Sequence, residues 1–226
     1  MGGPRRAALG AQPVAEPGSR LKLAREPRAA HVDRPPGAPL SGGAVQSEQL
    51  AVLKLVAQTL DGAGLPYMVS GSTAMNYYAQ PRMTRDIDVV VELSASDAPR
   101  VAQLFGRDFY LDVDAIADAI ARQGMFNLIH TAFVIKVDFI VRKTTPYRRE
   151  EFSRRRSVQV EDFTLSIVTA EDLVLSKLDW ASDSRSELQL GDVRNLIACV
   201  PQLDWSYVEG WARVLEIEDL LAEVRA

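Results

Sequence analysis

Apolar side chains recur along the chain with two periods, one typical of helices and one typical of strands. A stripe with helical spacing predicts a helix from Ser47, as its N-cap, to about Asp61; its members are Leu50, Leu53, Val56 and Leu60. Alternating or short apolar runs predict strands at residues 67–70, 86–93, 126–130, 133–141, 157–163 and 164–168. Further helices are expected after a Gly-Ser turn at residue 71, at 96–106, at 113–122, and from residues 146, 169, 188, 204 and 216.

This order of elements divides the chain into three parts. Residues 1–45 hold seven of the 12 prolines and seven of the 14 glycines without apolar periodicity, so we expect them to be a disordered tail. Residues 46–168 are expected to form the core, and residues 169–226 a C-terminal helical region. The predicted fold class is α/β (α+β), with a small mixed β-sheet and flanking helices.

Composition and charge restrict the function classes. The net charge of −4 is uneven: residues 1–45 carry +4 and the remainder −8, which argues against broad nucleic-acid binding through bulk charge. No apolar run approaches the roughly 18 residues of a membrane span, so we expect no membrane partner. The one cysteine, Cys199, is expected to be buried and inert, in keeping with a cytoplasmic protein.

Candidate chemistry begins at the second strand, where Asp86 and Asp88 point to the same face. Two neighbouring carboxylates repel each other unless a cation lies between them, and Mg²⁺ prefers such oxygen ligands. Upstream, Gly71 and Ser72 open a helix whose N-terminal N–H groups suit an anion. The alternative is an edge strand with two solvated aspartates.

Gly71-Ser72, thirteen intervening residues and then Asp86-Ile87-Asp88 resemble the signature of the DNA polymerase beta nucleotidyltransferase superfamily. The string GSTAMNYYAQPRMTRDIDVVV is most similar to the minimal nucleotidyltransferases around the AbiEii toxin family, whose pattern includes an Arg and a Thr, here Arg82 and Thr84. The resemblance covers roughly residues 47–200. It implies a nucleotidyltransferase fold, two Mg²⁺ ions, and transfer of a nucleoside monophosphate from an NTP.

Later segments extend this resemblance. Lys136 and Asp138 match a K-x-D motif that implies the third metal-binding carboxylate, beside Asp86 and Asp88; the alternative is a surface ion pair. DLVLSKLDW matches an apolar motif that ends in a lysine, Lys177, for which the alternative is a snorkelling surface side chain.

Asp192 matches the first acid of a fourth motif, D-h-x-D-h, but Asn195 stands where the second acid is expected. Asp192 is therefore either a general base or a structural partner of Lys177.

The resemblance implies a role for each of these residues. Asp86, Asp88 and Asp138 would hold the metal ions. Gly71 and Ser72 would hold the β,γ-phosphates, and Arg82 and Lys177 would neutralise the departing pyrophosphate. Thr84 and Lys136 complete the nucleotide-binding set, and Asp138, Lys177 and Asp192 the catalytic one.

The resemblance defines the acceptor less directly than the nucleotide donor. The resemblance suggests a tRNA 3′ end or a protein hydroxyl, in a toxin-antitoxin setting with a cognate antitoxin. The alternatives are a small-molecule acceptor, as in aminoglycoside nucleotidyltransferases, and a non-catalytic nucleotide- or RNA-binding antitoxin module. The basic segment 142–156 is either an RNA contact or a solvated face. Trp180, Trp205 and Trp211 are expected to pack between helices.

Overall fold

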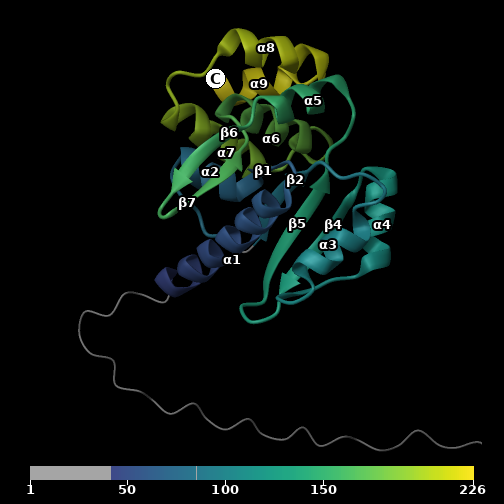
Figure 1. Cartoon of the computed structure of the whole chain (residues 1–226). Helices are drawn as coiled ribbons and strands as arrows, with labels where there is room; N and C mark the ends of the chain where they lie inside the picture. Colours follow the sequence, from purple (N-terminus) through teal and green to yellow (C-terminus); the bar gives the residue numbers. More distant parts are fainter. Residues whose placement is uncertain (1–41, 85) are drawn as a thin grey trace, which may run out of the picture. The chain divides into compact units, whose positions relative to one another are not determined.

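The computed structural model describes residues 42–84 and 86–226, and within them the chain forms nine helices and a seven-stranded mixed sheet (Figure 1). The predicted tail lies outside these residues, except for its last four residues, which are helical. The helices are α1 (Gly42–Ala63), α2 (Gly71–Tyr78), α3 (Ala98–Phe105), α4 (Val113–Arg122), α5 (Pro146–Ser153), α6 (Ala170–Ser184), α7 (Glu187–Cys199), α8 (Trp205–Val214) and α9 (Glu218–Arg225). The strands are β1 (Tyr67–Ser70), β2 (Asp86–Val91), β3 (Phe109–Tyr110), β4 (Met125–His130), β5 (Ile135–Val141), β6 (Arg156–Val160) and β7 (Phe163–Ile167).

The strand order is β3-β4-β5-β2-β1-β7-β6, so β2 is the central strand. It pairs in parallel with β5 and antiparallel with β1, while β1 pairs in parallel with β7. The outer pairs, β3 with β4, β4 with β5, and β6 with β7, are antiparallel. The predicted mixed sheet is confirmed, and the alternative in which the two aspartates stand on an edge strand is wrong.

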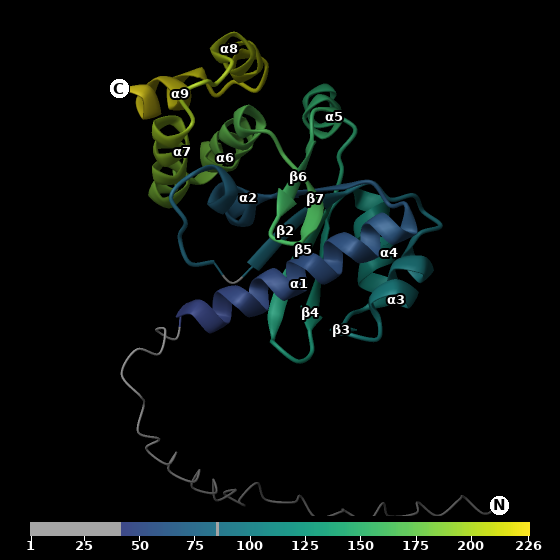
Figure 2. The same cartoon turned by 60° about the vertical axis from the view of Figure 1, so that its left-hand side comes forward.

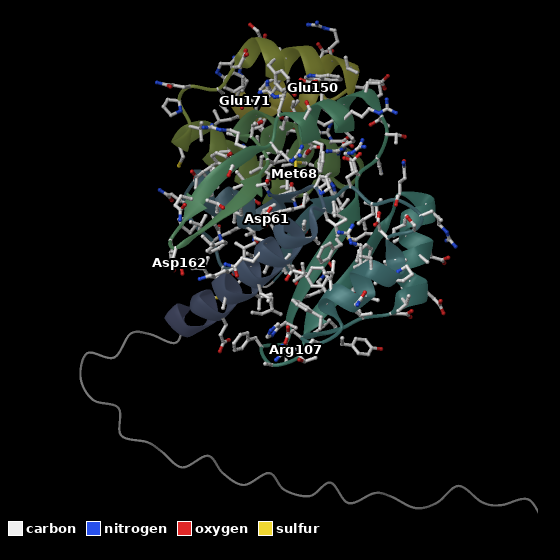
Figure 3. All side chains as sticks on the ribbon, viewed as in Figure 1. Asp61, Met68, Arg107, Glu150, Asp162 and Glu171 are labelled. Carbon is white, nitrogen blue, oxygen red and sulfur yellow. The ribbon has the colours of Figure 1, made fainter. Side chains whose placement is uncertain are left out.

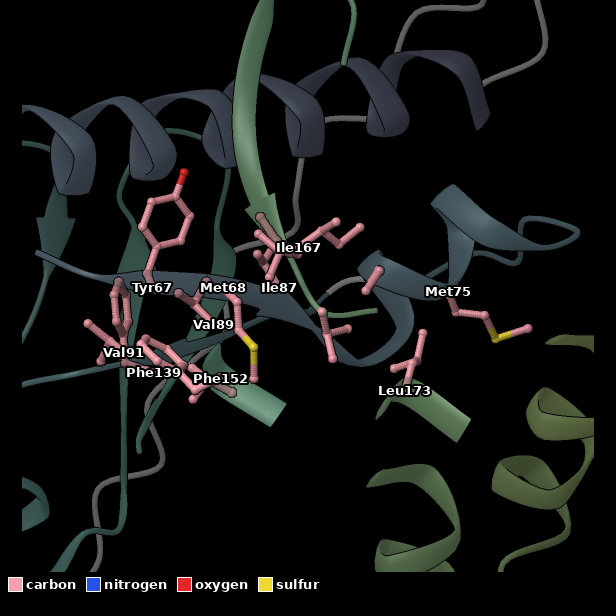
Figure 4. Packing of buried hydrophobic residues seen from close by; sticks show 14 of the residues in the cluster. Tyr67, Met68, Met75, Ile87, Val89, Val91, Phe139, Phe152, Ile167 and Leu173 are labelled. Atoms are coloured by element: carbon pink, nitrogen blue, oxygen red, sulfur yellow. The ribbon is translucent and has the colours of Figure 1, made fainter. Parts of the chain in front are cut away.

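Alternation along the strands gives the sheet two different faces. Tyr67 and Met68, neighbours on β1, point to opposite sides, with Tyr67 directed toward α1 (Figure 4). Ile87, Val89 and Phe139 are fully buried. The Phe139 ring packs edge-on against the ring of Phe105 on α3, with the two ring centroids 5.5 Å apart. One face of β2 and β5 is thus wholly apolar, whereas the other carries the aspartates.

The helices gather in different places around the sheet. Figure 2 shows α1 crossing in front of the strands, with α3 and α4 near the β3–β4 end. The C-terminal helices gather at the other end, above α2. Met68 lies near the middle of this body, while charged side chains such as Arg107 and Asp162 lie at its periphery (Figure 3). In the part of the chain that the structure describes, each helix is too short or too polar to cross a membrane.

A buried carboxylate joins three of the C-terminal elements. Asp172, on α6, is fully buried and accepts hydrogen bonds from the Tyr207 hydroxyl (2.6 Å), the Thr169 hydroxyl (2.6 Å) and Arg154 Nε (3.1 Å). A buried charge is tolerated only when it is paired and hydrogen-bonded, and these donors meet that need. Asp172 therefore links α6 to the end of α5 and to α8.

Most elements follow the sequence prediction, and the departures have local causes. Helix α1 begins at Gly42, so Ser47 lies inside the helix and is not its N-cap. Strand β5 begins two residues late because Val134 has a φ of 54°, which belongs to a turn. The turn between β6 and β7 falls at residues 161–162, before Phe163. Strand β3, with two residues, was too short to predict.

Candidate active site

Three acidic side chains meet on the polar face of β2 and β5. In the parallel register Asp88 lies beside Asp138, and Asp86 lies beside Lys136. Residues that are partners in neighbouring strands project to the same side, so all four side chains share one surface. The sequence placed Asp86 and Asp88 together, and the strand pairing adds Asp138.

Lys136 is held between two of these carboxylates. Its ammonium nitrogen lies 2.8 Å from Asp138 Oδ2 and 3.5 Å from Asp86 Oδ2. The hydrogen bond to Asp138 and the nearby negative charges raise the pKa of Lys136 above its usual value. Because Asp138 is buried, this is more than the surface ion pair considered as an alternative. Asp88, the third carboxylate, is not paired with Lys136 in this way.

The effect of this imbalance falls on Asp88. Burial raises the pKa of the Asp88 carboxyl above its ordinary value, and the charges of Asp138 and Asp86 raise it further. Lys177 and a hydrogen bond from the Ser72 backbone act in the opposite direction but do not cancel the rise. The surroundings of Asp88 therefore disfavour its charged form relative to that of an exposed aspartate.

The donor set fits a divalent cation that takes oxygen ligands, such as Mg²⁺. Asp138 Oδ1 is buried without a hydrogen-bond partner in the described residues, so one ligand atom is uncommitted. Within residues 42–84 and 86–226, no three His, Cys, Asp or Glu side chains already surround one ion-sized point. Lys136 supplies the positive charge near Asp86 and Asp138 instead.

The Gly71-Ser72 turn is built around Asp88. Gly71 has a φ of 59°, and a Cβ atom added there would lie 1.9 Å from Asp88 Oδ2. Only glycine combines this backbone conformation with so close an approach. The turn opens α2, whose first N–H groups face the acidic cluster, as the hydrogen bond from Ser72 to Asp88 indicates.

A second cluster lies behind the turn and is centred on Asp192. Arg82 makes a two-pronged contact with Asp192, from Nε to Oδ1 and from the terminal nitrogen to Oδ2, both at 3.0 Å. Lys177 reaches Asp192 Oδ2 at 2.8 Å and Gln189 Oε1 at 3.1 Å. Arg82 also donates to the Ser72 hydroxyl at 2.5 Å. The cluster joins α7, α6 and the loop before β2 to the glycine turn.

Burial and pKa define the state of this cluster. Lys177 is only 4% exposed, so the snorkelling alternative is wrong. Although burial acts to raise it, the pKa of Asp192 is lowered by hydrogen bonds from Arg82 and Lys177. Asp192 is thus an ionised partner of two cations. This arrangement corresponds to the predicted structural partner of Lys177 rather than to a general base. Asn195 donates to the Gln80 carbonyl (3.2 Å) and holds the same loop.

Thr84 lies close to the site but is directed at the backbone. Its hydroxyl donates to the Asp86 carbonyl oxygen at 3.3 Å, and the Thr73 hydroxyl reaches the same oxygen at 3.3 Å. The two threonines hold the start of β2, where the first aspartate stands. This contact gives Thr84 a positioning role rather than a place in the cavity wall.

Two small cavities open on the polar face beside these clusters. One, of about 130 Å³, is bordered by the glycine turn, Asp88, Lys177 and Gln189; the other, of about 120 Å³, reaches Arg142 and Lys143. They share four lining residues: Ser70, Ile140, Ser176 and Trp180. A larger cavity of about 670 Å³ lies among α1, β7 and α2, on the Val69 side of the sheet, away from the acids. Because Asp88, the glycine turn and Lys177 line the cavity of about 130 Å³, the chemistry is assigned there.

Sequence reasoning missed or misjudged several residues of the site. Trp180 is 66% exposed, so its predicted packing role is wrong, and Cys199 is exposed rather than buried. Gln189 and Asn127, which lies beside Asp138 on β4, were not singled out. Trp180 stands three residues after Lys177, so helical spacing could have identified it. The other two depend on the tertiary arrangement, and the local sequence gives no signal for them.

The basic segment 142–156 is partly engaged within the protein. Arg148 contacts Glu151, Ser176 and Asp179, and Arg154 contacts Asp172. Arg142 is paired with Glu92. These three arginines therefore join elements of the protein, which leaves less of the segment's charge for an RNA contact.

Comparisons with known proteins bear on the fold. No protein-family profile and no curated protein sequence matches the chain. The antibiotic-resistance factor ANT(2″)-Ia has a similar structure, with a TM-score of 0.51 and 11% identity over 78% of this chain and 96% of that one. An antigenic nucleotidyltransferase-like protein from Paracoccidioides brasiliensis (TM-score 0.49, 16% identity, 84% and 95% covered) and the lincosamide antibiotic adenylyltransferase LnuA (0.47, 13%, 69% and 98%) are also similar. The chain has the nucleotidyltransferase fold, as predicted.

Replacement of Gly71 tests the fit of the turn around Asp88. We expect Gly71→Ala to lower the free energy of unfolding by roughly 2–5 kcal/mol, because it adds both backbone strain and a steric clash. Gly64→Ala is the matched control: Gly64 has a φ of 64° with nothing within 4 Å of the added Cβ, so about 1–2 kcal/mol is expected. Urea denaturation measures both, and equal losses would contradict the proposed clash.

Replacement of Asp192 tests the second cluster. Asp192→Asn should cost about 3–5 kcal/mol of unfolding free energy, because it leaves buried Lys177 uncompensated. Asp118→Asn, which removes an exposed pair with Arg122, should cost about 0.5 kcal/mol or less. Since the pKa of Asp192 is lowered, its contribution is present above the ordinary aspartate pKa and disappears as the pH falls through its lowered pKa. Denaturation of both variants across the acidic range is the measurement.

Replacement of Asp88 should stabilise the metal-free protein. Because its pKa is raised, the fold loses stability as the pH rises from the ordinary aspartate pKa through the raised one. Asp88→Asn removes this loss, so its Tm in a chelator should exceed that of the unmodified protein at neutral pH, by about 2–4 °C per kcal/mol gained. Thermal unfolding from about pH 3 to pH 7 should show the two curves converging at the acid end. An unmodified protein that is the more stable of the two at neutral pH would refute the repulsion.

Proposed function

We propose that this protein is a Mg²⁺-dependent nucleotidyltransferase that moves a nucleoside monophosphate from an NTP to a hydroxyl acceptor. The observation that carries the proposal is the placement of Asp88 beside Asp138, with Asp86 on the same face and the Gly71-Ser72 turn against Asp88. Three carboxylates next to an anion-binding helix start suit a metal-bound triphosphate.

The acidic residues would hold the metal ions. Asp86 and Asp88 would bind both, and Asp138, with its uncommitted Oδ1, would complete the ligand set of one. When bound, such ions neutralise charge on the phosphates and favour in-line displacement. Lys136 lies among these carboxylates and would move aside or contact the nucleotide, which keeps it in the nucleotide-binding set.

The glycine turn and two cationic residues would bind the triphosphate. Gly71 and Ser72 would bind the β,γ-phosphates through backbone N–H groups and the serine hydroxyl. Lys177 borders the same cavity, and Arg82 already contacts the Ser72 hydroxyl, so both would stabilise the negative charge that develops on pyrophosphate.

Asp192 has the positioning role in this proposal. A lowered pKa makes a carboxylate a weak base, and its oxygens are committed to Arg82 and Lys177. Thr84 would act in the same way, through the backbone of Asp86. Both residues keep the reacting groups in place before the substrate arrives.

The proposed acceptor is a tRNA 3′ end or a protein hydroxyl, in an AbiEii-like toxin whose partner is a cognate antitoxin. A small-molecule hydroxyl, as in aminoglycoside-type enzymes, is the second candidate. The observation in its favour is the engagement of Arg142, Arg148 and Arg154 in internal contacts, which leaves less positive charge for RNA. The proposed setting is the cytoplasm.

Label transfer tests the proposal. Purified protein is incubated with each labelled NTP and Mg²⁺, and with tRNA, with lysate proteins or with aminoglycosides as separate acceptors. We expect one acceptor class to take up label, and Asp88→Asn to reduce the rate by about 100-fold or more, since metal stabilisation is worth several kcal/mol.

Asp118→Asn, on the exposed face of α4, is the matched control and should transfer label like the unmodified protein. Equal transfer by Asp88→Asn would refute the assignment of the site. Mg²⁺-dependent NTP binding without product in any acceptor arm would point instead to the non-catalytic nucleotide-binding module.

A further inference from the structure

Trp180 is a large apolar side chain in a place where packing does not require it. It is 66% exposed, although Leu178 and Ala181 on the same helix are fully buried. Its aromatic surface is therefore accessible to a ligand. Trp205 and Trp211, by contrast, pack against the core.

The position of Trp180 ties it to the candidate active site. It follows Lys177 by three residues on α6, so the two side chains are neighbours on one helix face, about 5–6 Å apart at Cβ. Both border the cavity of about 130 Å³ that also contains Gly71, Ser72 and Asp88. Trp180 and Ile140 also border the adjoining cavity of about 120 Å³. An aromatic wall therefore stands one side chain away from the phosphate-binding groups.

We propose that the exposed ring of Trp180 is the stacking surface for the nucleobase of the bound NTP, an inference that rests on the proposed function. A nucleotide whose β,γ-phosphates lie at Gly71, Ser72 and Lys177 places its base beyond the α-phosphate and the ribose. The indole ring offers a planar apolar surface in the wall of the same cavity, and Ile140 adds apolar surface from β5.

The size of the two cavities predicts how this base is held. Each is smaller than the roughly 300–1,000 Å³ of pockets that enclose a small ligand, so the base would stack on Trp180 with one face toward solvent. Stacking on an aromatic ring tolerates any base because every base has a π-face. Trp180 would thus add affinity for nucleotides as a class, without choosing among them.

Equilibrium binding without an acceptor tests this role. The probes are ATP and inorganic tripolyphosphate, each with Mg²⁺, and the readouts are the dissociation constant and tryptophan fluorescence. ATP, but not tripolyphosphate, should quench the unmodified protein. Trp180→Ala should abolish the quench and weaken ATP binding by about 5- to 150-fold, while tripolyphosphate affinity stays within about twofold. Trp180→Phe should restore most of the ATP affinity.

Tyr110→Ala is the matched control, since Tyr110 is an aromatic residue that is 71% exposed on β3, at the far edge of the sheet. It should bind both probes like the unmodified protein. Because Trp180 is exposed, its replacement should leave Tm unchanged within about 2 °C.

Each other outcome overturns the inference, and they differ in what they leave standing. Unchanged ATP affinity in Trp180→Ala would place the base elsewhere, and equal loss of both probes would make Trp180 a support of the phosphate site. An RNA 3′ end without a triphosphate that quenches like ATP would assign the ring to an acceptor base. An unmodified protein that binds neither probe would remove the proposed function itself.

Discussion

The parallel pairing of β2 with β5 is the constraint on which the site depends. The apolar faces of these strands set the register, because a slip of one residue would turn buried Ile87, Val89 and Phe139 toward the polar side. The same register places Asp88 against Asp138, an arrangement that repels when both are charged. Hydrophobic burial on one side of the sheet thus imposes an electrostatic cost on the other, which Lys136 offsets in part.

Positively charged side chains around the aspartates reduce this repulsion. Lys136 lies within the acidic cluster, and Lys177 acts from across the cavity. Lys177 is itself held by Asp192, which also holds Arg82 against the glycine turn. Acids and bases therefore fix one another's positions before any ligand is bound.

Local patterns predicted the fold well where they were long or contained a specific turn. The helix at 113–122, the two aspartates and the glycine turn could all be read from neighbouring residues. The position of Asp138 beside Asp88 depends on a pairing between strands about 50 residues apart. In the sequence, only the resemblance to the nucleotidyltransferase motifs indicated it. Trp180 was misjudged because an apolar residue on a helix usually packs, and its exposure is set by where β5 and α6 meet. The places of Gln189 and Asn127 at the site likewise depend on residues distant in sequence, so local patterns could not predict them.

Helix α6 joins parts of the protein that the sequence had suggested dividing at residue 169. Its first turn carries Asp172, which ties it to α5 and α8, and its middle carries Lys177, which faces the sheet. A chain in which everything after β7 was exchanged for another helical tail would therefore lose Lys177, a cation that borders the candidate site, together with Asp172, which anchors that tail.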